Sequence, residues 1–164
     1  MKVYIENRQR RIKVGRQKIG NLLRKALRLL RLPEAELSVL LVNDNRMRML
    51  NRQYRGIDRT TDVLSFPQCE DPSSPPFVKR ERMGFTDYES RITNYGPVLG
   101  DIVINLHKAE RQAAEYGLTL NEELRRLLIH GLLHLTGYEH EKGGYAERKM
   151  KDKTRYLLAR IGRT

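Results

Sequence analysis

Three histidines that lie close together in the sequence are the strongest constraint on how this chain folds. Residues 124–135 have the apolar spacing of an amphipathic helix, and the four-residue interval puts His130 and His134 on one face of it. Gly137 predicts the end of that helix, because glycine adopts the left-handed conformation that terminates helices. The turn that follows can bring His140 back beside the other two.

These three imidazoles have the spacing of ligands to one metal ion. Catalytic zinc sites use three protein ligands and leave a fourth position for water or substrate, whereas structural zinc sites are closed by four protein ligands. We therefore predict that His130, His134 and His140 bind one Zn²⁺ ion in a catalytic arrangement. Nickel or another divalent metal also accepts imidazole ligands and is the alternative to zinc.

The residue after the first histidine separates this pattern from that of a peptidase. Metzincin proteases share the histidine spacing, but a glutamate follows their first histidine and serves as the general base. Gly131 stands at that position here, and glycine cannot accept a proton from water. A zinc hydrolase that acts on peptides or amides is therefore the first alternative rather than the main interpretation.

The charge of the chain is concentrated in its first third. The net charge is +12, and residues 1–60 contain 16 Lys and Arg against 5 Asp and Glu. A solubilising surface explains any one of these side chains. The clustering of arginine favours a surface for a polyanion, because guanidinium groups neutralise phosphates and form paired hydrogen bonds with them.

The remaining composition is that of one globular domain spanning residues 1–164. No apolar run approaches the ~20 residues needed to cross a bilayer, and the first residues lack the apolar stretch of a signal peptide. Cys69 is the only cysteine, which excludes an internal disulfide bond. We expect a cytoplasmic protein with no membrane association, and the sequence does not predict its oligomeric state.

Hydrophobic periodicity predicts strands and helices in a mixed order. Strands are expected at 3–7, 36–42, 61–67 and 98–104, and helices at 14–32, 46–54, 106–116, 121–135 and 145–161. This order predicts an α/β (α+β) fold, in which a small mixed four-stranded sheet is covered by about five helices, including a zincin-like metal helix. Residues 68–97 contain several prolines and no sustained period, and we expect them to form a long mobile loop.

Three segments resemble the YbeY-type endoribonucleases, also described as ribosomal RNA maturation factors. They are LNRQYRGIDRTTDVLSFP at residues 50–67, LGDI at 99–102 and HGLLHLTGYEH at 130–140. They follow the order of the family, and the match runs from about residue 36 to the last helix. The sequence departs from the family in having Glu139 where aspartate is common, and in the greater length of the 68–97 loop.

The resemblance implies an activity, a metal and a partner. It implies a single-strand-specific, metal-dependent endoribonuclease that acts in 16S rRNA 3′-end maturation and ribosome quality control. It also implies zinc held by His130, His134 and His140, an arginine at position 55 that matters for activity, and single-stranded RNA, rRNA and the small ribosomal subunit as partners. A second alternative is a non-catalytic, basic ribosome-assembly factor whose zinc is structural.

The roles of other polar residues follow from this hypothesis. Zinc can activate water to attack an RNA phosphodiester without a strong protein base, and Arg55 is the candidate to clamp the phosphate. Two roles are open for Asp101, which either orients a ligand histidine or bonds the backbone near a bulge at Gly100. Glu139 is either an acid–base group or a solvated side chain. His107 is expected to be a surface histidine at the start of a helix.

Overall fold

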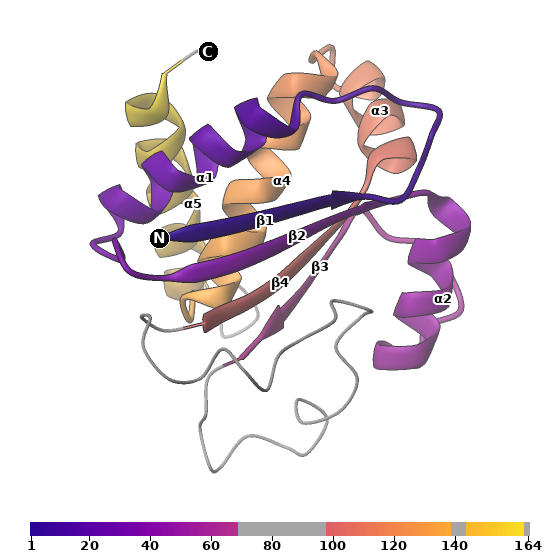
Figure 1. Ribbon diagram of the computed structural model, residues 1–164, viewed down its shortest axis with the longest axis horizontal. Helices are drawn as coiled ribbons and strands as arrows, with labels where there is room; N and C mark the ends of the chain where they lie inside the picture. Colours follow the sequence, from indigo (N-terminus) through magenta and orange to yellow (C-terminus); the bar gives the residue numbers. More distant parts are fainter. Residues whose placement is uncertain (69–97, 139–143, 163–164) are drawn as a thin grey trace.

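The computed structural model describes residues 1–68, 98–138 and 144–162. Within these ranges the chain forms four strands and five helices, with ends that differ from the predicted ones by a few residues (Figure 1). In chain order they are β1 (Lys2–Asn7), α1 (Arg16–Leu29), β2 (Glu36–Val42), α2 (Asp44–Arg55), β3 (Val63–Pro67), β4 (Val98–Asn105), α3 (Leu106–Glu115), α4 (Leu120–Leu135) and α5 (Gly144–Ile161). The predicted loop at 68–97 lies outside the described residues except for Gln68.

The four strands form one mixed sheet in the order β1-β2-β4-β3. β1, β2 and β4 are parallel to one another, and β3 is antiparallel to β4. β3 is therefore an edge strand, as expected from Pro67 at its end, because proline lacks the N–H group that a central strand needs. The predicted α/β class and the mixed four-stranded sheet are confirmed.

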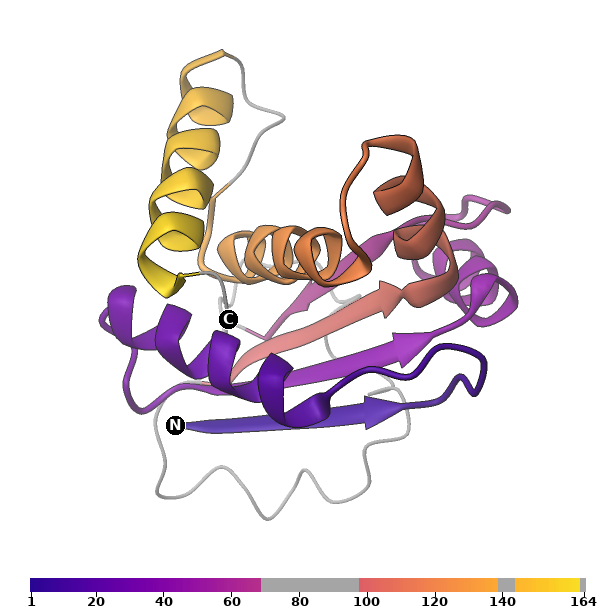
Figure 2. The same cartoon turned by 90° about the horizontal axis from the view of Figure 1, so that it is seen from above.

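The two faces of the sheet are covered unequally. Alternate residues of β2 enter two separate hydrophobic clusters, since successive side chains of a strand point to opposite faces. Val39 and Leu41 pack with residues of α1, α3, α4 and α5, while Leu40 and Val42 pack with residues of α2. Figures 1 and 2 show the four helices on one side and α2 on the other. In the part of the chain that the structure describes, no helix is long and apolar enough to cross a bilayer.

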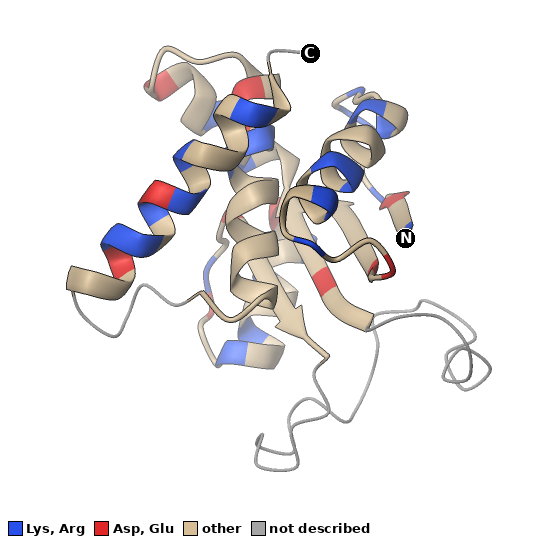
Figure 3. Cartoon of the chain, turned by 90° about the vertical axis from the view of Figure 1, so that its left-hand side faces the viewer, with Lys and Arg blue, Asp and Glu red and all other residues tan. Residues whose placement is uncertain are grey.

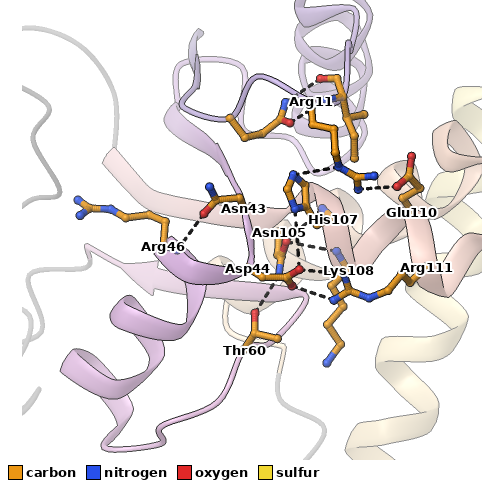
Figure 4. Close-up of polar contacts among 12 residues, drawn as sticks. Arg11, Asn43, Asp44, Arg46, Thr60, Asn105, His107, Lys108, Glu110 and Arg111 are labelled. Carbon is orange, nitrogen blue, oxygen red and sulfur yellow. Dashed lines mark hydrogen bonds and ion pairs between the residues drawn. The ribbon is translucent and has the colours of Figure 1, made fainter.

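A polar network joins the carboxyl ends of β2 and β4 to the helices that follow them (Figure 4). Asn105 is fully buried and caps α3, because its side-chain oxygen accepts a hydrogen bond from the backbone N–H of His107 at 3.1 Å. Its amide donates to the side chains of Asp44 and Thr60, each at 2.8 Å. Arg111 donates two hydrogen bonds of 2.8 Å to the Asp44 carboxylate. Mainly through these bonds from Arg111, the pKa of Asp44 is held well below its usual range.

His107 belongs to this network and not to the cluster of histidines on α4. It lies in the first turn of α3, as predicted, and its side chain is half-buried at 21% exposure rather than fully exposed. Its Nδ1 atom lies 3.8 Å from Oδ2 of Asp44, and its Nε2 atom accepts a 3.4 Å hydrogen bond from Arg11. His107 therefore helps to join the start of α3 to the start of α2 and to the segment after β1.

Candidate metal centre

The ends of α4 are fixed by local hydrogen bonds. Thr119 and Glu122 form a capping box at its start, in which each side chain accepts a hydrogen bond from the backbone N–H of the other residue. At its end Gly137 has φ +85°, its N–H donates to the carbonyl of His134, and the N–H of Tyr138 donates to the carbonyl of Leu133. This pair of bonds is the Schellman motif, which confirms the predicted helix end at Gly137.

His130 and His134 lie on one face of the last two turns of α4. In the stretch 127–135 they are the two residues that are not buried. Their Nε2 atoms are 3.0 Å apart, and their rings have centroids 4.6 Å apart at an angle of 80°. The prediction that the two imidazoles project from the same face is therefore confirmed.

The separation of the two Nε2 atoms is suitable for ligands of one metal ion. Two imidazole nitrogens bound about 2.05 Å from a tetrahedral ion lie about 3.3 Å apart, so only a small ring movement is needed. The observed 3.0 Å also allows one ring N–H to donate to the other ring nitrogen. An ion bound to both Nε2 atoms would require that proton to move to Nδ1 of its own ring, which keeps both imidazoles neutral.

The third predicted ligand, His140, lies outside the described residues, and so does Glu139. Across 1–68, 98–138 and 144–162 no group of three or more His, Cys, Asp or Glu side chains is placed to hold a metal ion. The described part of the chain therefore supplies two of the three predicted ligands. The left-handed turn at Gly137 redirects the chain three residues before His140. Ligation by His140 stays a prediction.

Gly131 allows α4 to pack closely against the sheet. A Cβ atom at this position would lie 2.9 Å from Cγ2 of Ile102 on β4 and 3.2 Å from the hydroxyl oxygen of Ser65 on β3. The Ser65 hydroxyl donates a 3.3 Å hydrogen bond to the Gly131 carbonyl. The position that carries the general base in metzincin proteases therefore faces β3 and β4 and has no room for a carboxylate. This packing argues against the peptidase alternative.

Gly100 and Asp101 form a tight contact between β4 and β3. Gly100 has φ +135°, and a Cβ atom there would lie 2.1 Å from the carbonyl oxygen of Phe66. Oδ2 of Asp101 accepts a 3.2 Å hydrogen bond from the side-chain amide of Gln68. Because Ile102 faces α4, strand alternation puts Asp101 on the opposite face of β4. The two predicted roles of Asp101, orientation of a ligand histidine and a bond to the backbone near Gly100, both stay predictions.

Arg55 is not in contact with the two histidines. It is the last residue of α2, which packs on the face of the sheet opposite α4, and its side chain is exposed. The edge strand β3 contacts both helices, because Phe66 packs on Tyr54 with ring centroids 5.0 Å apart while Ser65 bonds Gly131. Arg55 and the histidines therefore lie on either side of β3, and the role of Arg55 as a phosphate clamp stays a prediction.

Arg126 is a further polar residue on α4, and its place near the histidines was not predicted. It lies one helical turn before His130, and its guanidinium donates hydrogen bonds of 2.9 and 2.6 Å to Glu123. The side chain of Glu123 is fully buried, whereas that of Arg126 is 44% exposed. The accepting Glu123 carboxylate raises the pKa of Arg126. Arg126 lies four residues before His130, which lies four residues before His134. This spacing could have predicted a cation on the same face of α4 as the two histidines.

Comparisons with known proteins place this chain in one family. The model of the family "Endoribonuclease YbeY" matches residues 4–162. The chain is 40% identical to Endoribonuclease YbeY of Aquifex aeolicus, over 92% of this chain and 87% of that protein. It is also 40% identical to Endoribonuclease YbeY of Pelotomaculum thermopropionicum, over 100% and 99% of the two chains. The solution structure of TM1509 from Thermotoga maritima is 27% identical and superimposes with a TM-score of 0.61, covering 97% of this chain and 88% of that one.

Proposed function

Because this chain belongs to the Endoribonuclease YbeY family, we propose that it hydrolyses single-stranded RNA at a zinc site formed by His130, His134 and His140. The family supports an endoribonuclease that acts on RNA. The observation that carries the metal site is the 3.0 Å approach of the two Nε2 atoms on α4. The proposal goes beyond the family match in three respects, which are the metal, the preference for single-stranded RNA and the biological substrate.

The donor set suits a catalytic metal ion. Neutral imidazoles are common zinc ligands, and three of them leave one coordination position for solvent or a phosphate oxygen. When bound, zinc supplies Lewis-acid polarisation of a phosphate oxygen and lowers the pKa of water. The packing of Gly131 leaves no carboxylate next to His130, so the reaction does not depend on the base used by the metzincin proteases.

The chain's own residues position the RNA. The Schellman motif at Gly137 ends α4 three residues before His140, which we propose as the third ligand beside the pair on α4. Arg55 and Arg126 offer guanidinium groups on the two sides of β3, and guanidinium forms paired hydrogen bonds with phosphate oxygens. An RNA strand that crosses the edge of the sheet at β3 would contact both cations. Single-stranded RNA bends around such an edge more readily than a duplex does.

We propose 16S rRNA 3′-end maturation and ribosome quality control in the cytoplasm as the biological context. Support comes from the resemblance of the 50–67 and 130–140 segments to the family and from the basic first third of the chain. A surface rich in arginine and lysine suits rRNA and the small ribosomal subunit, because its charges replace the counterions of the phosphates.

Chelation tests the proposed function directly. We expect purified protein to contain about one zinc per chain and to cleave a single-stranded RNA at least about tenfold faster than the same sequence in a duplex. Treatment with a chelator should stop cleavage, and added Zn²⁺ should restore it. Cleavage that continues after the metal has been removed would contradict the proposal. Cleavage of a peptide but not of RNA would instead support the first alternative.

Arg55 provides a second prediction. We expect Arg55→Gln to lower kcat/KM for RNA cleavage by about 100-fold, the loss of ~2.7 kcal/mol of transition-state stabilisation, while the zinc content is unchanged. Arg52→Gln removes the same charge one turn earlier on the exposed side of α2 and is the matched control, with an expected loss below about threefold. Equal losses in the two variants would show that only the net charge of α2 matters.

A further inference from the structure

The segment that contains α1 has charge of one sign only. Residues 7–33 contain ten Lys and Arg and no Asp or Glu. α1 buries its apolar side in the main core, through Ile19, Leu23 and Leu27 among others. Its other side carries Lys18, Lys25 and Arg28, all exposed, so the outward face of the helix is basic. Figure 3 shows Lys and Arg along the ribbon of α1 and no Asp or Glu.

Four of these cations surround a recess on the surface. The recess has a volume of about 280 Å³ and is lined by Lys18, Asn21, Leu22, Arg24, Lys25 and Arg28. At a rise of 1.5 Å per residue, the row from Lys18 to Arg28 is about 15 Å long, enough to follow several phosphates of one nucleic-acid strand. We refer to Lys18, Arg24, Lys25 and Arg28 as the α1 basic face.

Among the described residues, α4 and α5 have ion pairs along the helix, whereas the α1 basic face has none. On α5, Lys151 lies 2.6 Å from Glu147, and on α4, Arg126 lies 2.6 Å from Glu123. In the described parts of the chain, no carboxylate forms a salt bridge with any of the four cations of the α1 basic face; Arg24 donates to the neutral amide oxygen of Asn21 at 2.8 Å. A surface built only for solubility intersperses both signs of charge, so this face is suited to an anionic partner.

We propose that the α1 basic face binds the phosphate backbone of RNA outside the stretch that is cleaved. α1 packs against α4 and α5, so RNA held there would be tethered to the same rigid body as His130 and His134. An anionic membrane is a poorer fit, because the apolar side of α1 is already buried in the core and cannot enter a lipid interface. This inference rests on the proposed function, since it assigns a second contact surface to the RNA substrate.

Binding of a labelled RNA hairpin with a single-stranded 3′ tail tests this inference. The variant carries Lys18→Gln, Arg24→Gln, Lys25→Gln and Arg28→Gln, and affinity is measured in chelator at several salt concentrations. We expect binding at least about tenfold weaker at about 100 mM salt and a slope of log K against log[salt] that is smaller by about 3, because four phosphate contacts are lost. Circular dichroism should show unchanged folding, since Lys18, Lys25 and Arg28 are exposed, Arg24 is half-buried, and none of the four belongs to the hydrophobic core.

The matched control removes four charges from α5. It carries Arg148→Gln, Lys149→Gln, Lys151→Gln and Arg155→Gln, whose side chains are exposed. We expect its affinity to stay within about threefold of the unchanged protein. Equal weakening in both variants would overturn the inference. The inference would also be overturned if the variant of the α1 basic face lost binding to anionic phosphatidylserine vesicles but kept its binding to RNA. Binding is measured without metal, so this result does not depend on RNA cleavage. A protein that binds RNA but does not cleave it would contradict the proposed function and not this inference.

Discussion

Replacement of His134 by alanine is expected to abolish metal retention and RNA cleavage together. The imidazole of His134 provides one of the two Nε2 atoms that meet at 3.0 Å, and a site with one ligand fewer holds zinc much more weakly. Without the Lewis acid, the rate of cleavage should fall by at least about 1000-fold, which corresponds to ~4 kcal/mol. The zinc content of the purified variant and its rate on single-stranded RNA are the two measurements.

His107→Ala is the matched control for this variant. It removes the same group from the start of α3, where His107 contacts Asp44 and Arg11. We expect it to keep its zinc and most of its activity. Thermal unfolding of both variants separates loss of the site from loss of the fold, because the His134 side chain is part-exposed and its removal leaves no large cavity. Cleavage by His134→Ala at the rate of the unchanged protein would contradict the account.

Gly100→Ala is expected to have the largest effect on stability. The backbone of Gly100 has φ +135°, which side chains rarely adopt, and the new methyl group would meet the carbonyl oxygen of Phe66 at 2.1 Å. That neighbour is backbone of a paired strand, so it can move only if the β3–β4 pairing changes. Strain and overpacking each cost about 1–3 kcal/mol, so we expect a loss of about 3–5 kcal/mol in the free energy of unfolding. Urea denaturation measures it.

Gly117→Ala separates the two causes of this loss. Gly117 also has a positive φ, +65°, but a Cβ atom there would have no neighbour within 4 Å. Only the backbone strain then remains, and we expect a loss of about 1 kcal/mol. If Gly100→Ala cost no more than Gly117→Ala, the close approach of β4 to Phe66 would not be a stabilising feature of the fold.

Local patterns in the sequence predicted the elements of the fold well. The apolar spacing of residues 124–135 and the glycine at 137 predicted α4 and its end, because both signals act through hydrogen bonds within a few residues. The order β1-β2-β4-β3 could not be read in the same way. It places β4 next to β2, although β3 and the 68–97 segment separate them in the sequence, and such pairing depends on contacts across the whole sheet.

The candidate site was predicted in part. The four-residue interval placed His130 and His134 on one face, and the structure confirms it. The sequence explained Gly131 only as a missing base, whereas the structure shows a helix packed too closely on Ile102 and Ser65 for any larger residue. The burial of Glu123 beneath Arg126 could not be predicted, because an acidic residue in the first turn of a helix is usually exposed.

X-ray absorption spectroscopy of the zinc-loaded protein would count the histidines that bind the metal ion. We expect three imidazole nitrogens at about 2.0–2.1 Å and one oxygen from solvent, with one imidazole lost in His140→Ala. A fourth protein ligand on the metal, or a spectrum that does not change in His140→Ala, would contradict the claim that three histidines hold an ion with an open position.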